Sequence, residues 1–338
     1  MLRSAQRDRG TPCDGSCRDV ALYWAGFAWR PIPRRCRSSM MSKQSVGFVG
    51  VGRMGSRMAR NVMKAGFPVT AFDLSQAALD ASVADGAARA SSAAEVASRS
   101  DVTITVLQSA GAVEAAYLGK GGIVEGIRPG TIAIDASTIS PTLTKRVAAE
   151  IEKAGAHFLD CPVSGGPVGA EKGTLSILVG GDEAVLARCR EVLEPMSGQI
   201  YHLGPVGAGL TGKLVNQLLI MSHMVLALEA LSVAAKAGMD LKVVYDLVSR
   251  SSGNSWAWQN RVPRYLSRPD DIWSTLDICH KDLMHATELA KDLQVPVFTA
   301  QAAFQVMQMG KAKGLGEGDL QELAQVYEET LGISLRAE

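Results

Sequence analysis

The sequence has almost no excess charge of either sign. Its 35 lysines and arginines are balanced by 34 aspartates and glutamates, which leaves a formal net charge of +1 over 338 residues. Proteins that attract nucleic acid or anionic membranes through their overall field carry a large positive excess. The balance removes any electrostatic argument for such partners, and we expect the chain to bind neither nucleic acid nor a membrane.

Aromatic residues and cysteines are scarce as well. Aromatics make up 5% of the chain and hydrophobic residues 47%, a composition that suits a soluble protein with helices packed closely against a sheet. The six cysteines form an N-terminal group and a dispersed group: Cys13, Cys17 and Cys36, then Cys161, Cys189 and Cys279. This spacing is not that of a disulfide framework, so we expect a reducing compartment. Cys13 and Cys17 have no second pair or histidine partner at a suitable distance, so we expect no metal site.

Residues 1–42 differ from the rest of the chain. Residues 1–41 contain eight arginines but only three aspartates, a composition found in organelle transit peptides. The aspartates and the Pro31–Pro33 cluster, however, disfavour an amphipathic helix. We therefore expect a disordered extension, or a start assigned upstream of Met40 or Met41, in a cytoplasmic protein. The alternative is a transit peptide and a mitochondrial location.

From residue 43 onward, short apolar runs alternate with helical segments. Strands are predicted at residues 46–49, 69–72, 102–107, 131–134, 158–159 and 175–179, and helices at 54–65 and 142–154. β-Branched residues and flanking turn residues favour strands in these runs. Strands that alternate with helices predict an α/β fold with a mostly parallel, doubly wound sheet, which we assign to residues 43–206.

The alternation stops near Gly204. Residues 209–237 form one long apolar helical stretch, and further helices are predicted at 241–249, 276–293, 297–311 and 319–331. The long stretch has the length of a membrane span, but polar residues such as Lys213 and Glu229 interrupt it. We therefore predict a buried inter-domain helix, and an all-helical second domain that covers residues 207–338.

A glycine-rich turn, Gly50-Val51-Gly52-Arg53-Met54-Gly55, lies directly between the first predicted strand and the first predicted helix. The G-x-G-x-x-G spacing is weak evidence alone, but the strand–turn–helix context is that of Rossmann domains, which bind dinucleotides. Gly50 permits the tight turn, Gly52 leaves room for the pyrophosphate, and Gly55 lets the helix pack on the strand. Backbone N–H groups at the helix start would then meet the phosphates. Arg53 would contact a phosphate or remain in solvent.

Asp73 ends the second predicted strand, 18 residues after Gly55. A carboxylate at this point can accept hydrogen bonds from the adenosine ribose hydroxyls, and it repels a 2′-phosphate. We therefore predict NAD rather than NADP as the cofactor. The alternatives are a flavin, an S-adenosylmethionine site, or a glycine-rich turn without a ligand.

Two later segments carry groups that suit catalysis. Ser164-Gly165-Gly166 offers a hydroxyl and unobstructed N–H groups, which suit a carboxylate, although an ordinary turn after a strand has the same composition. Lys213 lies near the start of the long apolar helix, with Asn216 and Gln217 three and four residues later on the same face. A single lysine there is normally solvated, but two amides beside it on a buried helix favour a site.

These segments resemble the β-hydroxyacid dehydrogenase family, which includes 3-hydroxyisobutyrate dehydrogenase. The resemblance covers residues 45–335 and rests on four segments in the family's order: the glycine turn, residues 160–174, residues 207–213 and Lys281-Asp282-Leu283. It implies that Lys213 is the catalytic lysine and that Ser164, Gly165 and Gly166 bind the carboxylate of the substrate.

The resemblance implies further roles. Many relatives carry asparagine four residues after the lysine; here Gln217 occupies that position and Asn216 precedes it, so either amide could hold substrate. Thr138 matches a residue near the nicotinamide, and Lys281 and Asp282 match a segment that closes over the cofactor. The family also implies a homodimer or homotetramer, with residues 207–338 contributing substrate and dimer contacts.

The stretch from Gly253 to Arg261 resembles the L-threonate dehydrogenase branch of the family. Asn254, Ser255 and Arg261 would suit a polyhydroxylated acid; the alternative is a structural turn with Trp256 in the core. We therefore expect NAD-dependent oxidation of a small β-hydroxy carboxylate to the oxo acid, with L-threonate or a related four-carbon sugar acid as the substrate. The alternatives are a 3-hydroxyisobutyrate dehydrogenase, a tartronate semialdehyde reductase and a non-catalytic NAD-binding module.

Overall fold

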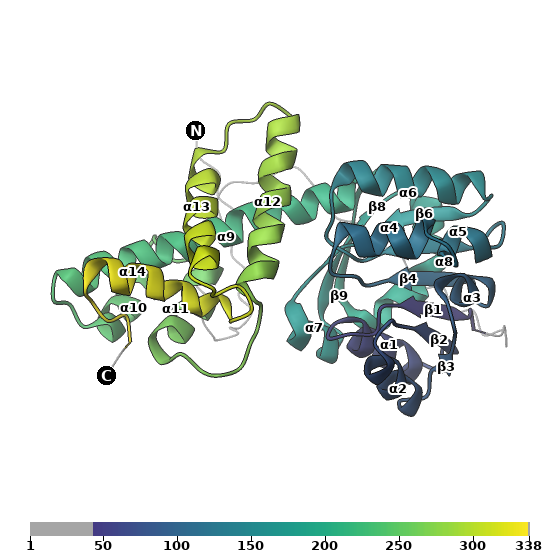
Figure 1. Ribbon diagram of the computed structural model, residues 1–338, viewed down its shortest axis with the longest axis horizontal. Coiled ribbons are helices and arrows are strands. Elements are labelled where there is room, and N and C mark those ends of the chain that lie inside the picture. The colour runs from purple at the N-terminus through teal and green to yellow at the C-terminus, as the bar shows by residue number, and fades with distance from the viewer. Residues whose placement is uncertain (1–42, 337–338) are drawn as a thin grey trace, which may run out of the picture. The chain divides into compact units, whose positions relative to one another are not determined.

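The computed structural model describes residues 43–336 of the chain. Within this range a nine-stranded sheet with its helices comes first, and further helices make up the remainder (Figure 1). The expectations for residues 1–42, including those for Cys13 and Cys17, concern residues outside the described part.

Six parallel strands form the main part of the sheet. They are β1 (Val46–Val49), β2 (Val69–Phe72), β3 (Ala88–Arg89), β4 (Val102–Thr105), β5 (Ile132–Asp135) and β6 (His157–Asp160). Their order is β3-β2-β1-β4-β5-β6, and every neighbouring pair is parallel. The strand order reverses between β1 and β4, and doubly wound sheets bind their ligands at the carboxyl ends of the strands at such a switch point.

Three more strands extend the sheet beyond β6. β8 (Leu175–Gly180) runs antiparallel to β6 and to the two-residue β7 (Val163–Ser164), and β9 (Ser197–Gly204) runs parallel to β8. The predicted α/β class with a mostly parallel, doubly wound sheet is confirmed by this arrangement.

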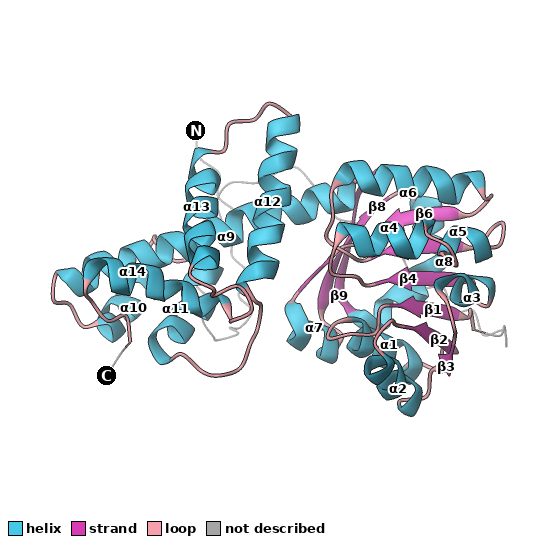
Figure 2. Cartoon of the chain, viewed as in Figure 1, coloured by secondary structure: helices cyan, strands magenta, loops and turns pink. Residues whose placement is uncertain are grey.

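Helices cover both faces of the sheet (Figure 2). They are α1 (Gly55–Lys64), α2 (Gln76–Ala84), α3 (Ala93–Ser98), α4 (Ala110–Leu118), α5 (Ile123–Gly126), α6 (Pro141–Lys153), α7 (Gly166–Lys172) and α8 (Glu183–Leu193), with a 3-10 turn at Glu194–Met196. Five of them begin after a side chain that accepts a hydrogen bond from the first turn, at Ser75, Ser92, Ser109, Ser140 and Asp182. These caps satisfy donors that have no partner inside the helix.

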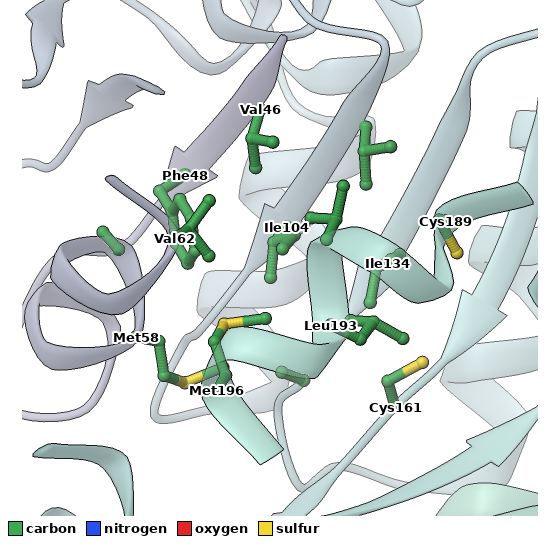
Figure 3. Packing of buried hydrophobic residues seen from close by; sticks show 14 of the residues in the cluster. Val46, Phe48, Met58, Val62, Ile104, Ile134, Cys161, Cys189, Leu193 and Met196 are labelled. Carbon is green, nitrogen blue, oxygen red and sulfur yellow. The ribbon is translucent and has the colours of Figure 1, made fainter. Parts of the chain in front are cut away.

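The two faces of the sheet carry separate hydrophobic layers. Successive strand side chains point to opposite faces, so Val46 and Phe48 of β1 belong to one layer and Val49 to the other. Figure 3 shows part of the first layer, where side chains of β1, β4 and β5 meet those of α1 and α8. Burial on both faces explains why the strand sequences are continuous apolar runs.

From Ala208 onward the described chain is helical. The helices are α9 (Ala208–Lys236), α10 (Leu241–Ser249), α11 (Trp256–Ser267), α12 (Leu276–Asp292), α13 (Phe298–Ala312) and α14 (Ala324–Leu331), with a 3-10 turn at Leu320–Leu323. Leu210 and Leu214 of α9 join a hydrophobic layer of the sheet, whereas Met224 and Leu228 join the core of the helical region. α9 is long and apolar enough to span a membrane, and half of its most apolar stretch is buried. One helix therefore contributes to both cores.

The predicted segments begin and end within two residues of observed elements, except at residues 319–331, which split into the 3-10 turn and α14. The elements that are not predicted are strands β3, β7 and β9 and helices α2, α3, α4, α5, α7, α8 and α11. The alternative that places Trp256 in the core is wrong, because its side chain is 58% exposed and Trp258 is 3% exposed. Ser255 caps α11, and the helical rotation that follows turns Trp256 outward and Trp258 inward.

Candidate active site

The glycine turn lies where β1 ends and α1 begins, at the carboxyl edge of the sheet. Gly50 has a φ of +91°, which residues with a Cβ rarely adopt. A Cβ on Gly55 would lie 2.0 Å from the carbonyl oxygen of Gly50, so only glycine lets α1 begin this close to the strand. A Cβ on Gly52 would meet no atom within 4 Å, so this face of the turn is open to a ligand.

The start of α1 offers hydrogen-bond donors to that open face. Its N-cap residue, Met54, makes no side-chain cap, and its first turn contains no acidic residue. The first N–H groups of a helix lack acceptors within the helix, and the helix dipole adds partial positive charge. The turn therefore fits a dinucleotide pyrophosphate. Arg53 donates a hydrogen bond to the carbonyl oxygen of Ile272 at 2.6 Å, which links the turn to the segment before α12.

Asp73 follows β2 and directs its carboxylate at the glycine turn. Oδ2 accepts a hydrogen bond from the N–H of Val51 at 2.8 Å, and Oδ1 accepts one from the N–H of Ser75 at 2.8 Å. Each carboxylate oxygen has a further lone pair, so Asp73 can also accept hydrogen bonds from ribose hydroxyls. Its negative charge beside the turn favours NAD over a cofactor with a 2′-phosphate.

Asp160 connects the end of β6 to the start of α9 through hydrogen bonds. Its two carboxylate oxygens accept hydrogen bonds from the N–H groups of Gly207 at 2.6 Å and Leu210 at 2.7 Å. Burial raises the pKa of this carboxyl, and the two hydrogen bonds oppose that effect. A Cβ on Gly209 would lie 2.3 Å from the carbonyl oxygen of Leu178, so α9 begins in close contact with β8.

The predicted carboxylate cradle follows Asp160 by four residues. Ser164 ends β7, and Gly165 and Gly166 lead into α7 with φ values of +130° and +61°. Both glycines are exposed and Ser164 is half-buried, so a ligand can reach the serine hydroxyl and the glycine N–H groups. Asp160 is the last residue of β6 and is hydrogen-bonded to the start of α9. The cradle and the start of α9 therefore both lie near the same end of β6.

Lys213 lies on the second turn of α9 and is 7% exposed. Burial lowers the pKa of its ammonium group, because the protein interior solvates a charge poorly. The negative charge of Asp282 acts in the opposite direction, and the positive charge of Lys281 adds to the lowering. A lysine with a lowered pKa is more often neutral near pH 7 and can then accept a proton.

A chain of polar contacts joins the surroundings of Lys213 to the loop after β5. Gln217, one turn beyond Lys213, donates a hydrogen bond to Asp282 at 2.5 Å. Lys281 forms an ion pair with Asp282 at 3.1 Å and donates a hydrogen bond to the carbonyl oxygen of Thr138 at 2.8 Å. The structure thus brings together five residues that the sequence placed in the site from three separate segments.

The two amides after Lys213 have different surroundings. Gln217 is buried against Asp282, whereas Asn216 is exposed and donates a hydrogen bond to Oε1 of Gln217 at 3.2 Å. Asn216 and Gln217 lie on opposite sides of Lys213 on one face of the helix. Of these two side chains, that of Gln217 faces α12. Gln217 therefore contacts the site residues of α12, and Asn216 remains open to solvent or ligand.

Comparisons with known proteins cover the same two regions. A family model described as the NAD binding domain of 6-phosphogluconate dehydrogenase matches residues 45–204. A second model, described as NAD-binding of NADP-dependent 3-hydroxyisobutyrate dehydrogenase, matches residues 207–327. The boundary between the matches falls between β9 and α9.

Curated relatives match over nearly their whole length. The 2-(hydroxymethyl)glutarate dehydrogenase of Eubacterium barkeri is 38% identical over 86% of this chain and 97% of its own. The NAD-dependent L-serine dehydrogenase of Pseudomonas aeruginosa is 34% identical over 86% of this chain and 99% of its own. The chain belongs to the β-hydroxyacid dehydrogenase family.

A solved structure of a β-hydroxyacid dehydrogenase supports the same assignment. The 3-hydroxyisobutyrate dehydrogenase of Mycobacterium tuberculosis with L-serine has a TM-score of 0.77 and 31% identity, and the match covers 84% of this chain and 98% of that one. As a β-hydroxyacid dehydrogenase, the chain is an oxidoreductase that acts on a CH–OH group with NAD as its cofactor. The predicted family and cofactor are confirmed.

The sequence assigns no role to the buried carboxylate of Asp135 in this β-hydroxyacid dehydrogenase. Asp135 ends β5, where it accepts hydrogen bonds from the hydroxyl of Thr105 at 2.7 Å and the N–H of Ser137 at 3.0 Å. Burial raises its pKa to about 6. An aspartate that ends a central strand is the signal that could have identified it, because the carboxyl ends of such strands hold the site.

The predicted substrate residue Asn254 lies just before α11. Its amide nitrogen donates a hydrogen bond to the carbonyl oxygen of Ser249 at 3.0 Å. The hydroxyl of Ser255 accepts a hydrogen bond from the N–H of Trp258 at 3.0 Å and so caps α11. The contacts of both side chains are thus local, and Ser255 has a structural role.

The cysteines of the described chain are free thiols. Cys161, Cys189 and Cys279 are all buried, and burial raises the pKa of Cys189 and of Cys279 to about 12. Such thiols stay protonated and are poor nucleophiles and metal ligands. Residues 43–336 contain no group of three or more histidine, cysteine, aspartate or glutamate side chains that could hold a metal ion.

Proposed function

We propose that this β-hydroxyacid dehydrogenase oxidises the β-hydroxyl of a small hydroxy carboxylate to the oxo acid, with Lys213 as the proton acceptor. The observation that carries the proposal is a buried lysine with a lowered pKa, on the helix whose start is bonded to Asp160. The polar contacts from Gln217 to Thr138 support it, because they connect the helix that carries this lysine to the cofactor side of the sheet.

Each group of residues has a separate task in this reaction. The Ser164 hydroxyl and the N–H groups of Gly165 and Gly166 hold the substrate carboxylate and so direct the β-hydroxyl at Lys213. NAD, held by the glycine turn and Asp73, would supply the hydride acceptor for the carbon that bears the hydroxyl. Neutral Lys213 takes the hydroxyl proton onto Nζ. In the reverse direction, the protonated lysine donates a hydrogen bond to the carbonyl oxygen and then gives up its proton.

The two amides beside Lys213 have different contacts, and we assign them different roles. Gln217 holds Asp282, which tunes the pKa of Lys213, and is a positioning residue. Oδ1 of Asn216 has no hydrogen bond to residues 43–336, and Asn216 is the amide we assign to substrate. Substituting Asn216 with alanine should raise KM for the acid, whereas Gln217→Ala should change the pH dependence of turnover.

Two substrates are supported by different observations. The resemblance of residues 253–261 to the L-threonate branch favours L-threonate or a related four-carbon sugar acid. Similarity to a 3-hydroxyisobutyrate dehydrogenase favours that acid instead. Ser255 is engaged as a cap, whereas Oδ1 of Asn254 and the Nε and Nη1 atoms of Arg261 are buried without a hydrogen-bond partner in the described chain. They support a substrate with a polar far end.

The test is NAD reduction, followed by the absorbance of NADH, with a panel of acids. The panel contains L-threonate, 3-hydroxyisobutyrate, glycerate and L-serine, with L-lactate as the control because its only hydroxyl is on the α-carbon. We expect reduction with one or more β-hydroxy acids and none with L-lactate. A chain that binds NAD and reduces it with no acid would be a non-catalytic NAD-binding module, and the proposal would be wrong.

We also propose that the chain assembles as a homodimer or homotetramer through α9. Val215, Leu219, Leu226 and Val233 are exposed on this helix. Their spacings of 4, 11 and 18 residues from Val215 place them on one face of the helix. Exposed apolar side chains that gather on one face of a helix mark a protein interface, and a second copy supplies the same face.

A further inference from the structure

Helix α11 carries two arginines and a third follows it directly, and one of the three lacks an acidic partner. Arg264 pairs with Asp271 at 3.1 Å and with Asp319 at 3.6 Å. Arg268, which follows the helix, pairs with Glu328 at 2.5 Å. Arg261 makes neither an ion pair nor a hydrogen bond with any residue in the range 43–336.

The guanidinium of Arg261 is buried despite having no partner. The residue is 9% exposed, and its Nε and Nη1 atoms are shielded from solvent. It lies over the ring of Trp273, whose centroid is 5.1 Å from Cζ. A cation–π contact offsets only part of the cost of removing a charge from water. A buried cation of this kind is stabilised when an anion binds beside it.

The surroundings of Arg261 place it next to the proposed site. Trp273 follows Ile272, whose carbonyl oxygen accepts the hydrogen bond from Arg53 of the glycine turn. The thiol of Cys279 lies 3.3 Å from the hydroxyl oxygen of Ser274, the residue after Trp273, and is within electrostatic range of Arg261. Burial raises the pKa of this thiol to about 12, Asp282 raises it further and Arg261 lowers it, so both charges lie near the thiol.

The same cysteine and aspartate also act on the proposed proton acceptor. Asp282 and Cys279 both influence the pKa of Lys213. Arg261 contacts Trp273 and, like Lys213, is within electrostatic range of Cys279 on α12. A substrate whose reacting hydroxyl is at Lys213 would extend its far end into this region.

We propose that Arg261 binds a second carboxylate of the substrate, so that the enzyme acts on hydroxy dicarboxylic acids. The proposal rests on the function proposed above and adds the substrate class. A carboxylate carries one negative charge and matches the planar guanidinium with two parallel hydrogen bonds. A hydroxyl group would leave the buried charge unneutralised, so a sugar acid or a methyl-bearing acid fits this position less well.

A matched pair of substrates tests the proposal. The two compounds are 2-(hydroxymethyl)butanedioate and 2-(hydroxymethyl)butanoate, which share one carboxylate and the β-hydroxyl. At the far end, the first has a second carboxylate and the second has a methyl group. For the wild-type chain we expect kcat/KM to be at least about tenfold higher for the dicarboxylate. Arg261→Met should remove that preference, because it removes one partner of a buried charge pair. Arg261→Lys should keep part of it.

Two controls separate a role in substrate binding from a role in folding or in cofactor binding. Arg250→Met removes an exposed arginine of the same helical region and should leave the preference unchanged. Butanedioate should inhibit the wild-type chain competitively and butanoate should not, which tests the site even if Arg261→Met fails to fold. An unchanged preference in the folded variant would overturn the proposal. The proposal would also be overturned if the variant lost affinity for NAD and not the substrate preference. That result would indicate that Arg261 binds a phosphate of the cofactor.

The result also distinguishes this proposal from the proposed function. If the wild-type chain oxidises the monocarboxylate and L-threonate but not the dicarboxylate, the proposal that Arg261 binds a second carboxylate is wrong. The proposed oxidation of a β-hydroxy acid is then still supported. If it reduces NAD with no member of either panel, the proposed function itself has failed.

Discussion

At the scale of single residues, the proton affinity of Lys213 depends on its burial and on the charges near it. Burial lowers its pKa, Asp282 raises it and Lys281 lowers it. The form that accepts a proton is the neutral amine. Oxidation should therefore speed up as the pH rises through the lowered pKa and then level off.

Replacing Lys213 with alanine should remove the proton acceptor and leave the cofactor turn intact. We expect kcat to fall by about 10²–10⁴-fold, the usual contribution of a positioned acid or base. The dissociation constant of NAD, measured by titration of protein fluorescence, should change little. Lys236→Ala, at the exposed end of the same helix, is the control and should keep full activity. Near-normal turnover of Lys213→Ala would remove this lysine from the mechanism.

Asp282→Asn should shift the pH profile without abolishing the reaction. The carboxylate raises the pKa of Lys213, so its removal should move the rise in kcat/KM to lower pH. An asparagine can still accept the hydrogen bond from Gln217. The profile is compared with that of Asp292→Asn, an exposed position at the end of α12. Superimposable profiles would mean that Asp282 does not act on Lys213.

At the scale of elements, the ends of β5 and β6 hold buried aspartates at the edge where the site lies. Asp135 is bonded to groups of β4 and of its own loop, and Asp160 is bonded to the start of α9. Burial raises the pKa of both carboxyls. These junctions connect strand ends to the elements that carry the cofactor-side and catalytic residues.

Asp160→Asn should weaken the connection between β6 and α9. Gly207 and Leu210 donate to different oxygens of Asp160, and asparagine replaces one of these with an NH2 group that cannot accept, so one buried donor loses its partner at a cost of about 1–3 kcal/mol. We expect a lower Tm and a lower kcat, since α9 carries Lys213. Asp182→Ala removes the cap of α8, which carries no site residue, and should lower Tm alone. Equal kcat in the two variants would contradict the positioning role.

Asp135 should make stability depend on pH in a predictable direction. Its pKa is about 6 in the folded chain and about 3.9 in an unfolded one, so the folded chain holds the proton more tightly. Its stabilising contribution is complete below about pH 4 and is lost as the pH rises through 6. The Tm of the wild-type chain relative to Asp135→Asn should therefore fall between pH 4 and 6 and then stay level. A constant difference from pH 4 to 8 would contradict this.

At the scale of the whole molecule, α9 has three functions in one helix. Its start is bonded to the sheet, its inner face contributes to two hydrophobic cores, and its outer face carries an exposed apolar stripe. The stripe contains the side chains that a second copy would cover. Assembly through this face would tie the position of Lys213 to the oligomer.

Charge on the apolar stripe should prevent assembly. Leu226→Glu combined with Val233→Glu places two like charges in the proposed interface, where they repel their copies in the partner. We expect a smaller mass by light scattering at the same concentration. Val243→Glu changes an exposed apolar residue on α10 and is the control. If the double variant keeps the mass of the wild-type chain, the interface lies elsewhere.

The elements near the cofactor could be predicted because their signals are local in the chain. β1, the glycine turn and α1 are contiguous, and a few residues of spacing describe them. Helices α3, α4 and α11 could not be predicted from periodicity, because they are short or carry tryptophan and proline within them. The serine caps Ser92, Ser109 and Ser255 were their clearest local signals.

The sequence by itself determined the cofactor and the family, since glycine spacing and an acidic residue at a strand end act through adjacent backbone. It also identified Lys213 as a candidate, but the burial that lowers the pKa of this lysine arises only from tertiary packing. The same packing decided between equal-looking side chains: Gln217 contacts Asp282, Asn216 does not, and Arg261 is the α11 arginine left without an acid in the described chain. Charge, burial and pairing depend on neighbours far apart in sequence, which no local pattern records.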